Sequence, residues 1–229
     1  MMRKSTVLIV LVVLLSISLM QAAVEPVAVV IKARGKVFLL QKGSKKGRPV
    51  KRGSRILPGQ SIFTKAKSFA IVRFVDNGGV VRIQAKSLCR FDGKRVKRNL
   101  AKNVYLKVGT IFSKIFRNKG GFKVTTPTSV ASVKGTAFWT KQLFKGATYY
   151  YGEEGVVEIA NANGVALLKA GMTGFVRSAG AKPIVRKTRK GEKPVLESAE
   201  QSLDEFDLEF EDANGNIKSL KFKIRKNNK

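Results

Sequence analysis

Short apolar runs separated by turn residues dominate the chain between Ala28 and Arg177. The runs are rich in Val, Ile, Phe and Tyr, which favour strands, and Gly, Pro, Asn and Asp fall between them. A βαβ unit needs a crossover of about a dozen residues or more, and these gaps are too short for one. The pattern therefore predicts an all-β domain. It leaves a sandwich, a barrel and a β-solenoid open, because no strict repeat period is visible.

Residues 122–139, FKVTTPTSVASVKGTAFW, carry the clearest local pattern. Alternation predicts a strand that ends before Pro127, then a second strand that is interrupted at Gly135. Phe138 and Trp139 are neighbours and should point to opposite faces of a strand, so we expect at most one of them to point fully inward. Almost none of these side chains can act as an acid, a base or a nucleophile. The segment is therefore interpreted as architecture.

Composition argues against catalysis. The chain has no histidine, which removes the commonest general base and the commonest metal ligand. Its single cysteine, Cys89, is expected to be a buried small apolar residue rather than a reactive thiol. Glu153 and Glu154 are adjacent, so in a strand they face opposite ways and cannot form a paired-carboxylate site. We therefore expect no enzyme, no metal site and no cofactor.

The formal net charge is +30, from 45 Lys and Arg against 15 Asp and Glu, and residues 24–150 hold 29 of the cations with three acids. Two loop-like segments carry dense basic clusters: Lys45, Lys46, Arg48, Lys51, Arg52 and Arg55 in the first, and Lys94, Arg95, Lys97, Arg98 and Lys102 in the second. Such a field attracts polyanions. A solvated surface and a contact with an anionic envelope polymer or lipid head group stay open. The scarcity of interleaved aromatic residues disfavours nucleic acid.

The N-terminal segment has the features of a secretory signal peptide. Arg3 and Lys4 precede an apolar stretch from Val7 to Met20, and small residues follow at Ala22 and Ala23. We expect export, with residues 1–23 as a signal peptide or, alternatively, a retained inner-membrane anchor. The apolar stretch is shorter than the roughly 20 residues of a spanning helix. The expected location is periplasmic or extracellular, with membrane contact only through this segment if it is uncleaved.

The C-terminal part of the chain is expected to form a separate tail. Residues 183–196 are interpreted as a basic linker, and residues 197–229 as a short helix followed by a β-hairpin. Apolar and charged residues alternate on both sides of Asn214-Gly215, a strong hairpin signal. A three-residue loop at 214–216, or an equivalent bulge, would place Phe210 opposite Leu220 and keep apolar residues on one face. An isolated hairpin is marginal, so this face should dock on the main domain or on a partner.

Ordered motifs along the chain resemble those of FecR-like domains. The segment from Thr126 to Phe138 is similar to the family's T-P-x-x-x-x-x-R-G-T-x-F, with Lys134 where arginine is usual. Further motif-like segments lie at 34–37, 57–64, 69–78, 109, 152–157 and 170–171, so the resemblance covers about residues 30–175. The matching residues, expected to shape the fold, are Gly59, Asp76, Gly78, Gly109, Thr126, Pro127, Gly135, Thr136, Phe138 and Gly155.

The resemblance implies a twisted β-solenoid or roll of many short strands over residues 24–182, followed by the C-terminal hairpin. FecR-like relatives bind a sigma factor through a cytoplasmic N-terminal part and sense an outer-membrane receptor in the periplasm. Because little chain precedes the apolar segment, we expect only the extracytoplasmic module. The expected function is an exported, non-enzymatic binding module whose partner is an envelope protein, an anionic envelope polymer or lipid. A sensor in a transmembrane signalling circuit and a polyanion-binding cell-wall protein remain the alternatives.

Overall fold

The computed structural model describes residues 24–44, 46–96, 99–116 and 120–195, together with two strands at 205–211 and 217–223. These residues form strands, turns and loops and contain no helix, which confirms the all-β prediction. In that part of the chain there is accordingly no helix able to cross a membrane. The predicted signal peptide at 1–23 lies outside the described residues. The chain divides into two compact units, Met1–Thr188 and Arg189–Lys229.

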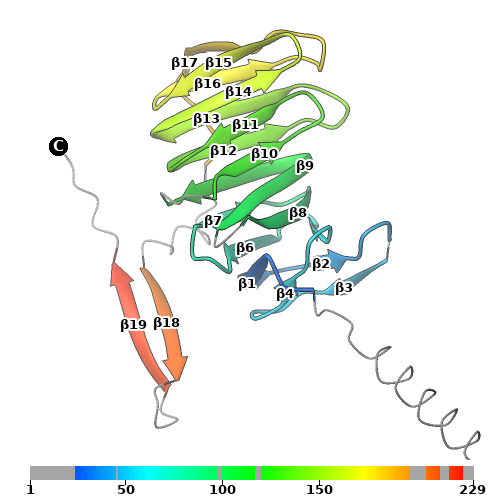
Figure 1. Cartoon of the computed structure of the whole chain (residues 1–229), viewed down its shortest axis with the longest axis vertical. Coiled ribbons are helices and arrows are strands. Elements are labelled where there is room, and N and C mark those ends of the chain that lie inside the picture. Colours follow the sequence, from blue (N-terminus) through cyan, green and yellow to red (C-terminus); the bar gives the residue numbers. More distant parts are fainter. Residues whose placement is uncertain are drawn as a thin grey trace, which may run out of the picture. The chain divides into compact units, whose positions relative to one another are not determined.

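The first unit is one open sheet of 17 strands that folds into two layers (Figure 1). Sheet A holds, in spatial order, β4 (Arg55–Ile56), β1 (Ala28–Arg34), β6 (Phe69–Phe74), β7 (Gly79–Ile83), the second half of β9 (Asn99–Ile115), β12 (Thr136–Gln142), β13 (Thr148–Glu154), β16 (Met172–Val176) and β17 (Ile184–Lys187). Sheet B holds β3 (Gly47–Pro49), β2 (Val37–Leu40), β5 (Ser61–Thr64), β8 (Ser87–Val96), the first half of β9, β10 (Phe122–Thr125), β11 (Val130–Val133), β14 (Val156–Asn161) and β15 (Gly164–Lys169).

Successive strands and hairpins alternate between the two sheets, so the chain stacks along one axis as it proceeds. Strands β1–β4 form one end of the first unit and β14–β17 form the other (Figure 1). The neighbouring strands are antiparallel except for β9 and β10, which run parallel. This stacked roll of short strands is the fold that the FecR-like resemblance implies.

Strand β9 joins the two sheets. Its first half pairs with β8 and β10 in sheet B, and its second half, from Gly109, pairs with β7 and β12 in sheet A. The sequence pattern predicted two strands separated by a turn at Gly109, which is wrong: the strand is continuous over 17 residues. Gly109 has a φ of +106°, and a Cβ there would lie 2.2 Å from Oγ of Ser87. Glycine therefore lets one strand change sheets without a break.

The core lies between the sheets and is filled by the inward residues of both. Phe74 from sheet A packs against Phe91 and Phe122 from sheet B, with ring centroids 6.3 Å and 5.6 Å apart. All three rings are almost completely buried. Phe122 opens the segment that the sequence singled out, so this segment starts in the centre of the core.

Phe138 and Trp139 point to opposite faces of β12, as expected, and both are buried. Phe138 points into the core, whereas Trp139 lies on the outer face of sheet A beside Phe112. The Trp139 ring lies 4.9 Å from the Phe112 ring, and its Nε1 donates a hydrogen bond to Glu153 at 2.9 Å. The outer face of this sheet thus carries its own packed aromatic layer, which period-two alternation alone does not reveal.

Strand pairing extends further than the sequence indicated at the C-terminal end of the first unit. Residues Ile184–Lys187, interpreted as part of a basic linker, form β17 and pair with β16. Within the described strands, β15 and β17 each pair on one side only, as do β3 and β4 at the opposite end. Strands β3 and β4 are only three and two residues long. Very short edge strands are a common way to prevent pairing with a strand of another chain.

The second unit contains a hairpin of β18 (Glu205–Glu211) and β19 (Ile217–Lys223). Its register places Leu208 opposite Leu220 and Asp207 opposite Lys221, and residues 212–216 connect the strands. The predicted three-residue loop is therefore wrong by a shift of two residues. Such a shift leaves apolar positions opposite apolar positions, so the alternation could not distinguish the two registers. The short helix predicted at 197–205 falls largely outside the described residues.

Candidate functional site

The outer face of sheet B presents side chains in straight rows, because six neighbouring strands are in register. One row runs Asp92, Asn103, Lys123, Ser132, Glu158 and Leu167 across β8, β9, β10, β11, β14 and β15. A second row, two residues away along each strand, runs Lys94, Ala101, Gly121, Lys134, Val156 and Lys169. Together they place residues from opposite ends of the domain sequence on one surface.

All residues of these two rows except Lys169 line a shallow groove of about 700 Å³. Its floor is low because Ala101 and Gly121 carry almost no side chain, and a Cβ on Gly121 would meet nothing within 4 Å. Lys94 and Lys134 flank this floor and are exposed. They stand three strands apart, about 14 Å at the usual inter-strand spacing of about 4.8 Å. Small residues therefore form the floor of the groove, and the exposed ammonium groups of Lys94 and Lys134 lie on its two sides.

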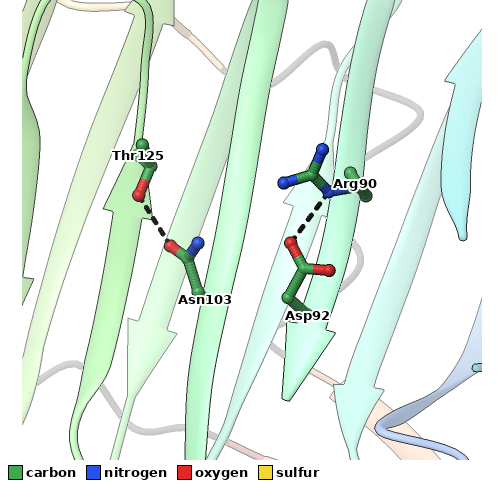
Figure 2. Close-up of polar contacts among 4 residues, drawn as sticks. All are labelled: Arg90, Asp92, Asn103 and Thr125. Atoms are coloured by element: carbon green, nitrogen blue, oxygen red, sulfur yellow. Dashed lines mark hydrogen bonds and ion pairs between the residues drawn. The ribbon is translucent and has the colours of Figure 1, made fainter. Parts of the chain in front are cut away.

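Acidic residues offset little of this positive charge. Asp92 accepts a hydrogen bond from Nε of Arg90 at 2.8 Å, as Figure 2 shows, so its charge is already paired on the same strand. Arg90 also lies over the ring of Tyr105, 5.2 Å from its centroid. Lys94, Lys123 and Lys134 line the groove against the remaining acid, Glu158.

Polar groups in the groove are held in place by neighbouring strands. Thr125 of β10 donates a hydrogen bond to Oδ1 of Asn103 of β9 at 2.8 Å (Figure 2). This contact uses the Asn103 carbonyl oxygen, so its amide NH₂ remains the group that can donate to a ligand. The groove thus offers lysine cations and an amide donor, which is a chemistry suited to phosphate, sulfate or carboxylate groups.

Lys102 does not belong to this surface, although the sequence grouped it with the second basic cluster. Its side chain is fully buried, and its Nζ lies 2.5 Å from Oδ2 of Asp76 on the β6–β7 turn. Asp76 also accepts a hydrogen bond from the backbone N–H of Gly78 at 2.9 Å. The grouping is therefore wrong for Lys102: it joins sheet B to a turn of sheet A across the core.

The remaining basic residues divide between two places. Those of the first cluster lie on and beside β3 and β4 and are exposed: Lys46, Arg48, Lys51, Arg52 and Arg55. In the second cluster Lys94 borders the groove, whereas Arg95 is paired with Glu25 through Nε and Oε2 at 2.6 Å. Lys45, Lys97 and Arg98 lie outside the described residues. Lys123 and Lys134 are further surface cations that were not predicted as binding residues. Their alternation with Phe122, Val124 and Val133 was the available signal.

The motif at 126–129 builds a polar link between the two sheets. Thr126 and Thr128, on the loop from β10 to β11, contact the Thr148 hydroxyl of β13 at 3.0 Å and 2.5 Å. Ser129 contacts the Tyr150 hydroxyl, also on β13, at 3.0 Å. All five side chains are buried. Because these buried hydroxyl groups all have hydrogen-bond partners, the network fixes the position of the loop on β13. Its role is therefore structural.

Other motif residues lie at turns between strands. Pro127 is exposed on the same loop, Gly59 precedes β5, and Gly135 precedes Thr136, the first residue of β12. Gly155, between β13 and β14, has a φ of +71°, and a Cβ there would lie 2.8 Å from Cγ2 of Thr136. Gly155 thus lets the two turns pack together.

The Cys89 thiol and the Tyr150 hydroxyl are enclosed in the core. Burial raises the pKa of the Cys89 thiol, and the side chain is completely buried as the sequence indicated. Burial also raises the pKa of Tyr150, although hydrogen bonds with Ser129 and Thr126 oppose the shift. Neither group offers an accessible nucleophile at neutral pH. The described residues contain no cluster of three or more His, Cys, Asp or Glu that could hold a metal ion.

Two layers of short stacked strands with a basic groove on one face define an all-β, non-helical module. Residues 60–158 match the model of the family described as FecR protein, which confirms over this stretch the resemblance that the motifs indicated. Two crystal structures of a proposed anti-sigma factor from Parabacteroides distasonis ATCC 8503 are similar at 20% identity and a TM-score of 0.48. Each alignment covers 56% of this chain and 59% of the other. No curated protein matches the sequence.

Proposed function

We propose that the chain is an exported, non-enzymatic FecR-like module that binds a linear anionic polymer of the cell envelope along the groove of sheet B. The observation that carries the proposal is that the exposed lysines Lys94 and Lys134 flank the groove, with exposed Lys169 beyond it on β15. Export follows from the signal-like sequence of residues 1–23. The enclosed thiol and the lack of histidine support binding rather than catalysis.

The spacing of the cations favours a polymer over a small ion. Lys94 and Lys134 are about 14 Å apart, and Lys134 and Lys169 about 10 Å, counting strands at about 4.8 Å each. One phosphate or carboxylate cannot contact all three, because Lys94 and Lys169 lie about 24 Å apart, whereas a chain with repeated anionic groups can. Lys134 also stands where FecR-like motifs usually carry arginine, so the resemblance implies a cation at this place.

Binding of full-length chain in nonionic detergent to inorganic polyphosphate and to polyglutamate tests the proposal. We expect Lys94→Ala/Lys134→Ala to weaken binding about tenfold, since two exposed charge contacts contribute up to about 1 kcal/mol each. Lys36→Ala/Lys182→Ala is the matched control, because it removes two exposed charges outside the groove and should change affinity little. Equal weakening by both variants would mean that only net charge matters, and would contradict a groove. Tighter binding of an acidic envelope protein than of either polymer would overturn the choice of partner.

A second candidate function is the sensor component of a transmembrane signalling circuit, with a separate protein supplying the cytoplasmic output. The FecR-like match at residues 60–158 favours it, because the periplasmic part of FecR-like relatives senses an outer-membrane receptor. Occupancy of the groove would then be the sensed signal. Transcript profiles of a deletion strain under envelope and iron stress distinguish the two, since a purely structural polymer-binding protein predicts no specific regulon.

A further inference from the structure

A second basic surface lies at the end of the first unit that contains β1–β4. Five cations are exposed there: Lys46, Arg48, Lys51, Arg52 and Arg55. The sequence has no Asp or Glu between Glu25 and Asp76, and no ion pair of the described residues involves any of the five. We call these five residues the basic edge. Among the described residues their charge is therefore not paired with an acid, unlike that of Arg90 or Arg95.

The basic edge is tied to the start of the domain by backbone hydrogen bonds. The N–H of Val27 donates to the carbonyl of Ile56 at 2.8 Å, and the N–H of Gly53 donates to the carbonyl of Val30 at 2.8 Å. Strand β4 pairs with β1 through Val29 and Arg55. The loop that carries Lys51 and Arg52 is thus fixed beside the point where the chain enters the domain.

The chain that leads to this point is short and apolar in sequence. Only seven residues separate Met20, the end of the apolar stretch, from Ala28, the first residue of β1. Fully extended, they span about 25 Å at most. When the apolar stretch is in a bilayer, the basic edge is therefore confined to the vicinity of the lipid head groups.

We infer that the basic edge rests on an anionic phospholipid surface and orients the domain, leaving the groove of sheet B for a separate ligand. Clustered Lys and Arg next to a membrane-inserted segment each contribute about fivefold to partitioning onto anionic lipid. The edge has the composition that such binding needs: cations on short strands and turns, with almost no acidic residues nearby. Contact with lipid would also cover the one-sided strands β3 and β4.

Co-sedimentation of the full-length chain with two kinds of vesicle tests this inference. One kind is phosphatidylcholine alone, and the other is phosphatidylcholine and phosphatidylglycerol in equal parts. The apolar stretch should bind both alike, so the ratio of the two partition coefficients isolates the charge-dependent part. We expect the wild-type chain to prefer the anionic vesicles at least about tenfold at low salt, and the preference to shrink as salt rises.

The variant Lys46→Gln/Lys51→Gln/Arg52→Gln changes only residues outside strands and should lose most of this preference. The groove variant Lys94→Ala/Lys134→Ala removes two cations elsewhere and should keep it, so a failure of this inference is distinguishable from a failure of the groove. An unchanged preference in the edge variant would overturn the inference. It would also be overturned if the edge variant lost polyphosphate binding but kept its preference for anionic vesicles, since a soluble polyanion would then be the occupant.

Discussion

Lys102 carries a charge into the core between the two sheets, and Asp76 is its counter-charge. The sequence presented Lys102 as one more cation in a basic stretch. The inward residues of β9 are Leu100, Lys102, Val104 and Leu106, so its place among alternating apolar residues was the signal that it is buried. Its partner could not be predicted, because Asp76 lies 26 residues away on the other sheet.

Removing the charge of Asp76 should destabilise the fold. Asp76→Asn keeps an oxygen for the Gly78 N–H but leaves the buried Lys102 without a counter-charge, which we expect to lower the free energy of unfolding by about 3 kcal/mol. Urea denaturation of the full-length chain measures this. Asp76→Asn/Lys102→Met should recover most of the loss, and Glu25→Ala, which breaks an exposed pair, should cost at most about 1 kcal/mol. A loss as small as that of Glu25→Ala would show that the buried pair contributes nothing.

The sequence predicted the two halves of strand β9 but not that they form one continuous strand. The apolar alternation on both sides of Gly109 is real, and each half was predicted to be a strand. The continuity was missed because glycine is read as a turn residue, whereas here it marks a close approach to Ser87. The hairpin β18–β19 failed in a similar way: its alternation was correct, and its loop length was not.

Gly109→Ala tests whether the change of sheet depends on glycine. A methyl group would lie within 2.5 Å of Cα of Ser87, and alanine disfavours the φ of +106°. We expect a loss of stability of about 1–3 kcal/mol, by steric overlap and backbone strain together. Thermal unfolding followed by circular dichroism is the measurement, with Gly180→Ala as control because a Cβ there would meet nothing within 4 Å. Equal stability of both variants would mean that β9 accommodates a side chain at the crossing.

At the scale of the whole molecule, turn spacing was enough to predict the all-β class, and the ordered motifs were enough for the FecR-like roll. Neither could predict the groove. Its rows depend on pairings such as Ser132 with Glu158 and Lys123 with Asn103, which join residues far apart in sequence. Strands of both sheets alternate apolar and polar residues, so the alternation does not tell which hairpin joins which layer. The basic residues were visible, but not which of them share a face.

Hydrogen exchange of the full-length chain with and without inorganic polyphosphate tests whether a polyanion binds in the groove of sheet B, because protection from exchange locates the polymer on the fold. Binding in the groove should slow exchange in β8, β10 and β11 and in the Gly120–Gly121 turn. This protection should be lost in Lys94→Ala/Lys134→Ala. Protection confined to β3 and β4, or spread evenly over all basic segments, would contradict a ligand-binding groove on sheet B.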